Sequence, residues 1–232
     1  MTALRRIARL EHRLTRPDAS LGDLDAALRI VREHELATLT VTPWLVRPAV
    51  RMGLPAGVRL AAVIGYPHGG QVSAVKAFEA SRALEDGATE LDFVINAGSL
   101  LSGDEAAALA DMQAVVEMAH SAVARCGAIV QTGQLSDDIV VRAGRLAARA
   151  GVDHLVTSSG EEPASVAIGL TSILHRLSGE HEVKAAGVFT TLAEITEAFA
   201  AGAAGVSASL SPELAAEADA WLREPVLAKR AG

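Results

Sequence analysis

Several polar side chains capable of proton chemistry lie within or directly after short apolar runs. Asp92 and Asn96 belong to one such run, and Lys184 belongs to another, later in the chain. A carboxylate can accept and return a proton, and a lysine can attack a carbonyl when it is uncharged. A charged lysine instead donates hydrogen bonds and stabilises a developing oxyanion. These residue types therefore point to acid–base or carbonyl chemistry.

The chain has only three lysines, so each can be considered in turn. Lys76 begins a predicted helix, where we expect a solvated or locally paired charge. Lys229 lies in the last few residues, which are expected to fray. Lys184 lies in an apolar run, and a buried lysine almost always needs a partner. Two interpretations of Lys184 are therefore open: a structural ion pair with Asp92 or Glu11, or a functional role.

Composition limits the class of protein. The chain has 232 residues, of which 50% are hydrophobic, and this suits a single domain spanning residues 1–232. A net charge of −7 and an aromatic content of 3% argue against general nucleic-acid binding. No apolar run approaches the length of a membrane span, and the first residues lack the apolar segment of a signal peptide. Because Cys126 is the single cysteine, we expect a cytoplasmic protein.

No sequence pattern indicates a metal or a cofactor. No spacing of His, Cys and carboxylate residues suggests zinc. The glycines Gly65, Gly69 and Gly70 match neither a P-loop nor a dinucleotide fingerprint. We therefore expect no metal and no cofactor, and a small molecule as the substrate.

Short β-rich runs alternate with Ala- and Leu-rich amphipathic segments. The predicted strands are 9–14, 37–42, 59–65, 90–96, 127–132, 154–158, 183–186 and 205–209. The predicted helices are 21–35, 74–86, 105–120, 137–150, 164–177, 192–200 and 213–227. This alternation favours a parallel sheet, and eight such strands favour a closed (β/α)8 TIM barrel. Active sites of such barrels lie at the carboxyl ends of the strands, where the polar residues of this chain fall.

Several motifs occur in the order and spacing of a known family. They are Gly65-Tyr66-Pro67-His68-Gly69, Lys76-Ala77-Phe78-Glu79-Ala80, Glu90-Leu91-Asp92-Phe93-Val94-Ile95-Asn96-Ala97-Gly98 and Val183-Lys184-Ala185-Ala186-Gly187. Together they resemble the deoxyribose-phosphate aldolase family, and the likeness covers nearly the whole chain. The resemblance implies a TIM barrel and a lyase of the aldolase type. Since relatives of this fold are often dimers or larger, it also implies a homo-oligomer.

One position separates this chain from the family it resembles. The family's sixth strand reads Lys-Thr-Ser-Thr-Gly, and that lysine forms the Schiff base. The corresponding stretch here is Asp153-His154-Leu155-Val156-Thr157-Ser158-Ser159-Gly160, with Val156 in the lysine's place. Valine has no nucleophile, so the chain resembles the family's scaffold without the atom that defines its chemistry.

The resemblance assigns roles to two further residues. Asp92 matches the family's proton-relay aspartate, and Lys184 matches a second active-site lysine that lowers the pKa of the first. Without that cationic neighbour, and with the charge of Asp92 nearby, we expect Lys184 to be protonated. It then serves as a hydrogen-bond donor, an oxyanion stabiliser or a general acid, and imine formation on it is disfavoured.

Other positions depart from the family pattern. Glu11 replaces an aspartate, Thr40 a cysteine and Gln131 a glutamate, while Gly127 stands where a lysine is often found. The alternative reading of Asp92 and its polar neighbours is a satisfied polar layer inside the barrel. The residues predicted to bind or orient the substrate are Glu11, Thr40, Asn96, Gln131, Ser158, Ser209 and His68.

Three histidines fall near the predicted site. His68 lies on a loop at its rim and is either a general acid or base or a solvated side chain. His12 follows Glu11 directly, so its side chain should point to the opposite face and be structural. His154 shares the inward parity of Val156 but lies deeper in the barrel.

The family's phosphate-binding segments are also altered. They use backbone N–H groups and glycines after strands seven and eight. Here these segments read Gly187-Val188-Phe189-Thr190 and Ser209-Leu210-Ser211-Pro212-Glu213, and Glu161-Glu162 follows strand six. Ser211 and Pro212 form a good helix start, so Glu213 places a carboxylate where a phosphate would sit. We infer an unphosphorylated substrate, with outward-pointing surface glutamates as the alternative.

Three functions remain open. The first is an enzyme repurposed for cofactor-independent cyclisation, dehydration, isomerisation or an aldol-type step, within bacterial specialised metabolism. The second is residual aldolase activity with Lys184 as the nucleophile. The third is a catalytically silent binding or scaffold protein.

Overall fold

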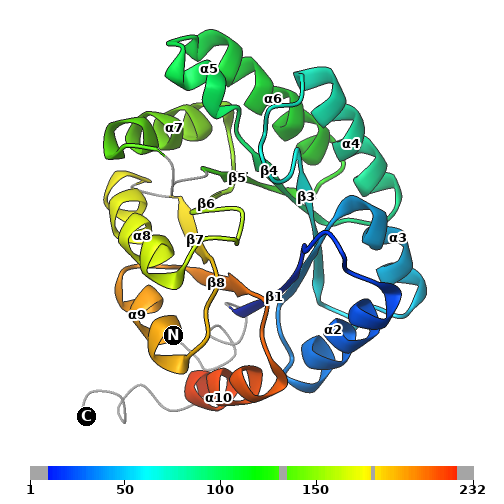
Figure 1. Ribbon diagram of the computed structural model, residues 1–232. Coiled ribbons are helices and arrows are strands. Elements are labelled where there is room, and N and C mark those ends of the chain that lie inside the picture. Colours follow the sequence, from blue (N-terminus) through cyan, green and yellow to red (C-terminus); the bar gives the residue numbers. More distant parts are fainter. Residues whose placement is uncertain (1–9, 131–134, 179–180, 224–232) are drawn as a thin grey trace.

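The structure is a computed structural model that describes residues 10–130, 135–178 and 181–223. Eight parallel strands pair in chain order, and β8 closes the barrel against β1. The strands are β1 (Leu10–Leu14), β2 (Thr38–Val41), β3 (Arg59–Ile64), β4 (Glu90–Val94), β5 (Arg125–Ile129), β6 (His154–Val156), β7 (Glu182–Ala186) and β8 (Gly205–Ala208). The predicted (β/α)8 TIM barrel is confirmed (Figure 1).

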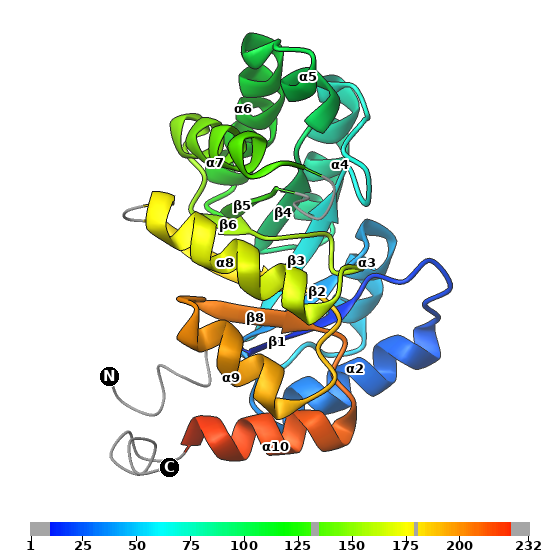
Figure 2. The same ribbon diagram turned by 60° about the vertical axis from the view of Figure 1, so that its left-hand side comes forward.

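Helices surround the ring of strands, as the rotated view also shows (Figure 2). They are α2 (Leu21–Glu33), α3 (Pro43–Arg51), α4 (Ser73–Glu85), α5 (Ala97–Leu101), α6 (Glu105–Ser121), α7 (Asp137–Ala150), α8 (Ala164–Ser178), α9 (Leu192–Ala200) and α10 (Pro212–Arg223). None of these helices is long and apolar enough to cross a membrane. Most boundaries lie within two residues of the predicted ones, and α3 and α5 were not predicted at all.

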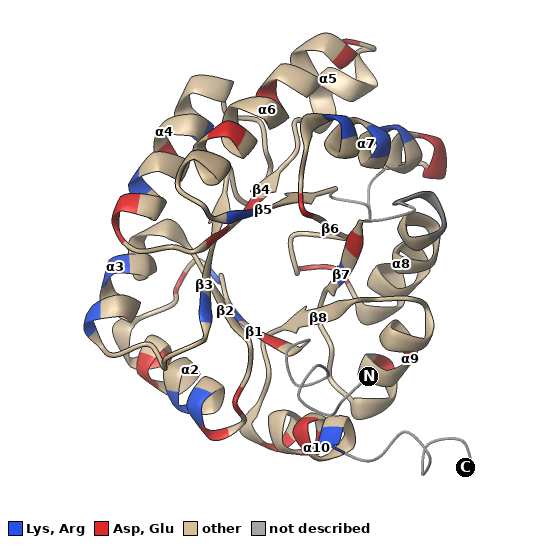
Figure 3. Ribbon diagram, turned by 180° about the vertical axis from the view of Figure 1, so that it is seen from behind, with Lys and Arg blue, Asp and Glu red and all other residues tan. Residues whose placement is uncertain are grey.

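The strands have an apolar outer face and a largely polar inner face. Outward residues such as Leu39, Leu91 and Leu155 are buried in the main core between strands and helices. Each such side chain contributes about 1.5–3 kcal/mol when it is removed from water. Inward residues include Glu11 and Lys184, which are also buried. Figure 3 shows charged residues on strands of the ring as well as on the surrounding helices.

Local capping signals fix the elements next to the predicted site. The Ser211 hydroxyl accepts the N–H of Leu214 at 3.1 Å, and Pro212 is the first residue of α10. The predicted start of this helix is confirmed. Gly151 ends α7 with a φ of 92°, a left-handed conformation that favours glycine, and so turns the chain into β6.

Candidate active site

Lys184 lies at the centre of a group of buried charges on the inner face of the barrel. Its Nζ is 3.0 Å from Glu11 Oε1 and 3.8 Å from Asp92 Oδ2, and it also forms an ion pair with Glu90. The structure therefore places three of the predicted site residues together and adds a fourth that the sequence did not suggest. We call Glu11, Glu90, Asp92, His154 and Lys184 the charged cluster.

The surrounding carboxylates keep Lys184 charged. Burial favours the neutral amine, but the charges of Asp92, Glu11 and Glu90 outweigh it and raise the pKa of Lys184 well above its ordinary value. An amine held in this state has no lone pair to attack a carbonyl. The geometry agrees with the expected protonation, and the cation is shared by three carboxylates instead of by Asp92 alone.

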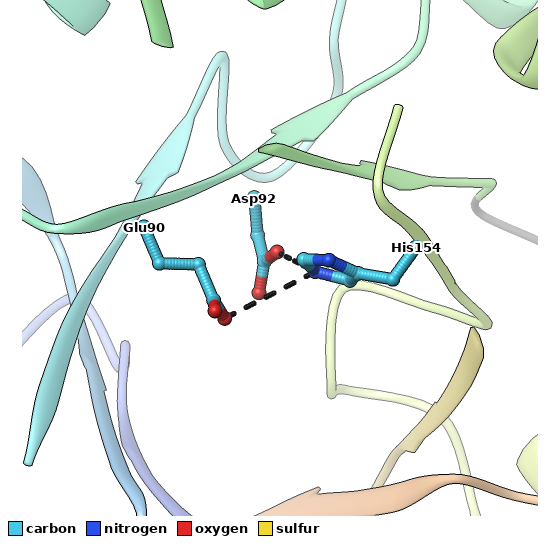
Figure 4. Close-up of side chains that lie close together, drawn as sticks. All are labelled: Glu90, Asp92 and His154. Carbon is cyan, nitrogen blue, oxygen red and sulfur yellow. Dashed lines mark hydrogen bonds and ion pairs between the residues drawn. The ribbon is translucent and has the colours of Figure 1, made fainter. Parts of the chain in front are cut away.

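His154 on β6 forms a hydrogen bond with Asp92 on β4. Its Nε2 is 2.7 Å from Asp92 Oδ1 and 4.0 Å from Glu90 Oε1. Figure 4 draws the three side chains and marks both contacts with dashed lines. Burial would raise the pKa of Asp92, but the charges of Lys184 and His154 and the hydrogen bond from His154 lower it. Asp92 is therefore an ionised hydrogen-bond acceptor at neutral pH.

Glu11 differs from Asp92 in the direction of its pKa shift. Burial raises the pKa of Glu11, the charge of Lys184 lowers it less, and the charges of Glu90 and Asp92 raise it further. Its side chain is more exposed than that of Glu90, at 3% against 0%. Within the charged cluster, Glu11 is thus the carboxyl group whose pKa is raised, while the pKa values of Glu90 and Asp92 are lowered.

Gly127 makes room for the pairing of His154 with Asp92. A Cβ atom added at Gly127 would lie 2.1 Å from His154 Nε2 and 2.6 Å from Asp92 Oδ1. No side chain fits there while the histidine is in place. Strand pairing sets Gly127 directly between these two residues, opposite both Asp92 and His154. Gly127 therefore leaves the space that the paired side chains of His154 and Asp92 occupy.

Three members of the cluster also form a donor set that could hold a metal ion. Donor atoms of Glu90, Asp92 and His154 lie within 4.8 Å of one another. The ammonium of Lys184 already contacts both carboxylates and supplies a positive charge. A second cation would be repelled by it, so the donor set fits a metal poorly. The sequence spacing did not suggest this grouping because its members come from two strands, β4 and β6.

Apolar side chains lie one step nearer the carboxyl ends of the strands. Val94, Val156 and Ala186 each follow a cluster member by two positions on the same strand. Together with Val63 and Ile129 they form a buried apolar group, here called the apolar ring, against which Tyr66 packs. Val156 is fully buried in this ring, where its side chain packs against the other apolar residues.

Asn96, Ser158 and Ser209, which were predicted to bind the substrate, each form a hydrogen bond within the chain. The Asn96 side chain accepts the N–H of Ser99 at 3.2 Å and caps α5. Ser158 donates to the Ala186 carbonyl, and Ser209 donates to the Arg13 carbonyl.

Two predicted residues lie near the barrel axis or its rim, and one lies outside the described residues. Thr40 is buried and its hydroxyl has no partner among the described residues. His68 is exposed on the loop that follows β3. Gln131 lies outside the described residues. The structure thus brings Glu11, Asp92 and Lys184 together, and does not join His68 to them.

The expectation for Lys76 was wrong. Its side chain is fully buried, and Nζ lies 2.6 Å from Asp111 Oδ2 and 2.9 Å from the Val94 carbonyl oxygen. The partner is 35 residues away in the sequence, so local spacing could not reveal it. This ion pair joins α4 to α6 and to the end of β4, and it is structural.

The backbone N–H groups after β7 already have partners. The carboxylate of Glu194 accepts the N–H groups of Thr190 and Thr191 at 2.7 and 3.1 Å, at the start of α9. These bonds lower the pKa of Glu194. The N–H of Val188 is donated to the Glu162 carbonyl oxygen at 2.8 Å. In the segment where the resemblance suggested a phosphate site, the N–H groups of Val188, Thr190 and Thr191 are therefore donated to groups of the chain itself.

In the segment after β8, a backbone N–H group is likewise donated within the chain. The N–H of Leu210 is donated to His12 Nδ1 at 3.3 Å. The backbone N–H of Glu213 and the Ser211 hydroxyl lower the pKa of the Glu213 carboxyl group, which lies at the start of α10. The other acidic position, Glu161, is exposed and accepts the hydroxyl of Tyr66 at 2.8 Å.

Comparisons with known proteins agree with the fold and the motifs. The family described as DeoC/LacD family aldolase matches residues 9–212. A deoxyribose-phosphate aldolase of Rhodopirellula baltica is 31% identical over 219 residues, covering 94% of this chain and 91% of the relative. One from Streptococcus pneumoniae is 34% identical over 201 residues, covering 86% and 90%.

Solved structures give the same picture. The aldolase QR15 superposes with a TM-score of 0.84 at 25% identity, covering 94% of this chain and 96% of the other. The tetrameric deoxyribose-phosphate aldolase of Aeropyrum pernix superposes with a TM-score of 0.82 at 27% identity, covering 91% and 89%. The chain belongs to the DeoC/LacD family of aldolases.

Proposed function

We propose that this chain is an aldolase-family enzyme repurposed for acid–base chemistry that does not pass through a Schiff base. Its substrate is a small unphosphorylated carbonyl compound, and the reaction is a cyclisation, dehydration, isomerisation or aldol-type step in bacterial specialised metabolism. The names of its relatives support a lyase. One observation carries the proposal: the amine of Lys184 is held charged by three carboxylates. The sequence resemblance adds the expectation that Val156 stands at the position of the nucleophilic lysine.

In this proposal Lys184 acts as a charged donor to the carbonyl oxygen of the substrate. Donors aimed at developing negative charge stabilise a transition state without reorganising at the moment of reaction. Asp92 accepts the proton that leaves the carbon next to that carbonyl, and its hydrogen bond to His154 fixes its orientation. Glu11, whose pKa is raised, returns a proton on the more exposed side of the cluster. Positioned proton transfer of this kind contributes about 10²–10⁴-fold to a rate.

The absence of a phosphate from the proposed substrate rests on the segments after β7 and β8. Their N–H groups are donated to Glu194, to Glu162 and to His12. A phosphate dianion placed there would break these bonds and approach the carboxylate of Glu194 or Glu213. Both effects oppose phosphate binding.

Exchange of carbon-bound hydrogen with solvent tests this function. The protein is incubated in D2O with acetaldehyde, hydroxyacetone, deoxyribose or deoxyribose 5-phosphate, and loss of the proton signal next to the carbonyl is followed by NMR. The proposal expects exchange with an unphosphorylated compound, and a loss of at least about a hundredfold in Asp92→Asn. Exchange restricted to deoxyribose 5-phosphate, or undiminished in Asp92→Asn, would contradict it.

A second function, a binding or scaffold protein without catalysis, is favoured by the burial of the cluster. Asp92 is 1% exposed and His154 is fully buried, so these charges pair mainly with one another. This function predicts that Asp92→Asn and Lys184→Ala leave the biological role intact. The tetrameric relative from Aeropyrum pernix supports homo-oligomeric assembly in either case, which light scattering measures directly.

A further inference from the structure

Arg13 is a buried cation above the charged cluster that the proposed reaction does not use. It lies on β1 two positions after Glu11, so its side chain starts on the same inner face and one step nearer the carboxyl ends of the strands. The residue is only 2% exposed. Burial raises the pKa of Asp92. The charge of Arg13 lowers it, by less than the charges of Lys184 and His154 do.

The guanidinium group is only partly satisfied by the protein. Nη1 donates to the Ser159 carbonyl oxygen at 2.9 Å. Nε and Nη2 are buried and have no hydrogen-bond partner among the described residues. Within the same described part of the chain, no carboxylate forms an ion pair with Arg13. An arginine stays charged in proteins, and a buried charge without a counterion is costly.

The surrounding backbone is shaped around this side chain. Gly160 has a φ of +97°, and a Cβ added there would lie 2.7 Å from Arg13 Nη1. The connection from β6 to α8, which carries Ser159 and Gly160, bends inward across the ring of strands in Figure 1. Its next residue, Glu161, is held by the Tyr66 hydroxyl at 2.8 Å. Arg13 is thus enclosed beneath a loop at the carboxyl end of the barrel.

Other unpartnered polar atoms lie on the same side of the barrel. The Thr40 hydroxyl on β2 and the Ser207 hydroxyl on β8 are buried without a partner among the described residues. Strand pairing places Thr40 beside Arg13, and Ser207 beside Glu11. The apolar ring, in contrast, is supplied by strands β3 to β7. Buried polar atoms without a hydrogen-bond partner in the described part of the chain therefore lie beside Arg13 on β8, β1 and β2, and others lie on Glu90 and His154.

We propose that Arg13 binds a carboxylate group of the substrate, with Thr40 and Ser207 completing the site. This inference rests on the proposed function, and it narrows the substrate class to small carbonyl acids such as 2-oxo acids. The free Nε and Nη2 form the planar fork that pairs with a carboxylate. A phosphate dianion fits less well, because the N–H groups of Thr190 and Leu210, after β7 and β8, are already donated within the chain.

Binding of defined probes tests the site without turnover. Dissociation constants are measured by calorimetry for pyruvate, 2-oxobutyrate and 2-oxoglutarate, for neutral hydroxyacetone, and for inorganic phosphate. At least one oxo acid is expected to bind, and Arg13→Gln should weaken it about ten- to a hundredfold. Hydroxyacetone should change less than about threefold. Arg13→Lys keeps the positive charge but lacks the planar fork. Its affinity for the oxo acid should therefore lie between those of the parent protein and Arg13→Gln.

Two controls keep the outcome clear. Arg142→Gln removes an exposed arginine that pairs with Glu105 on the outer face, and it should leave oxo-acid binding unchanged. Circular dichroism checks that each variant is folded, and Arg13→Lys serves if Arg13→Gln is not. The proposal is overturned if no oxo acid binds, if Arg13→Gln binds it equally well, or if phosphate is the anion that depends on Arg13. If only the proposed reaction is wrong, oxo-acid binding should still depend on Arg13 while no hydrogen exchange is seen.

Discussion

Replacing Gly127 by alanine should damage the charged cluster more than any change of one methyl group elsewhere on the inner face. The added Cβ would lie 2.1 Å from His154 Nε2 and 2.6 Å from Asp92 Oδ1, both far inside van der Waals contact. Neither partner can withdraw easily, because both are buried and joined by a 2.7 Å hydrogen bond.

The expected cost has two parts. Overpacking of a dense interior costs about 1–3 kcal/mol. Loss of the charge-assisted bond between His154 and Asp92 costs about a further 1.5–3 kcal/mol. Gly127→Ala should therefore lower the free energy of unfolding by about 2.5–6 kcal/mol. Urea unfolding followed by circular dichroism measures this change, with Gly169→Ala as the control. A Cβ at Gly169, in α8, meets nothing within 4 Å, and alanine should stabilise that helix by about 0.5–1 kcal/mol.

A double variant separates the specific clash from general damage. Removing the ring by His154→Ala should relieve much of the strain, so the two substitutions together should cost at least about 1.5 kcal/mol less than the sum of the single changes. Strict additivity, or a Gly127→Ala variant within about 0.5 kcal/mol of the parent protein, would refute the packing described for this cluster.

Other changes test structural roles assigned above. Lys76→Met should cost about 3–5 kcal/mol by leaving Asp111 as an unpaired buried charge, and adding Asp111→Leu should recover much of it; equal urea stability of the single and double variants would argue against the pair. Asn96→Ala should lose the α5 cap and about 1 kcal/mol, with little loss in Asn96→Asp, which thermal unfolding would check. Burial lowers the pKa of His12 from 6.5 to about 4. The stabilisation by the buried neutral ring is therefore complete above pH 6.5, falls below that pH, and is lost once the pH has fallen through 4. That loss is about 3 kcal/mol, and His12→Asn should reduce it in urea titrations at each pH; an unchanged pH profile would contradict the buried neutral ring.

Much of the fold was predictable because its signals are local. Continuous apolar strands and amphipathic helices alternate along the chain, so their order and approximate bounds followed from periodicity. The two helices that were missed lack such signals. Helix α3 contains Pro48 in its interior, and α5 has only five residues. The strand predicted at 127–132 begins at Arg125, whose side chain pairs with Glu182 across the barrel end.

The candidate site was predictable only in part, because its contacts are long-range. The inward parity of Glu11, Asp92 and Lys184 follows from the sequence, but their shared ion pairs depend on how the strands are staggered. Glu90 has the same parity and carried no separate signal. His154 was expected to point inward and to lie deeper, but its partner was not predicted. Local competition explains one difference: Asn96 directly precedes α5, so its side chain caps that helix.

Mass spectrometry after borohydride reduction tests the central claim most directly. The protein is incubated with deoxyribose 5-phosphate, with acetaldehyde or with pyruvate, reduced, digested and mapped. Our account predicts no adduct on Lys184 in the parent chain, because three carboxylates keep its amine protonated. It predicts an adduct at the introduced amine in Val156→Lys, whose neighbour across the strands is Lys184. A reduced adduct on Lys184 in the parent chain would contradict the account and restore imine chemistry to this protein.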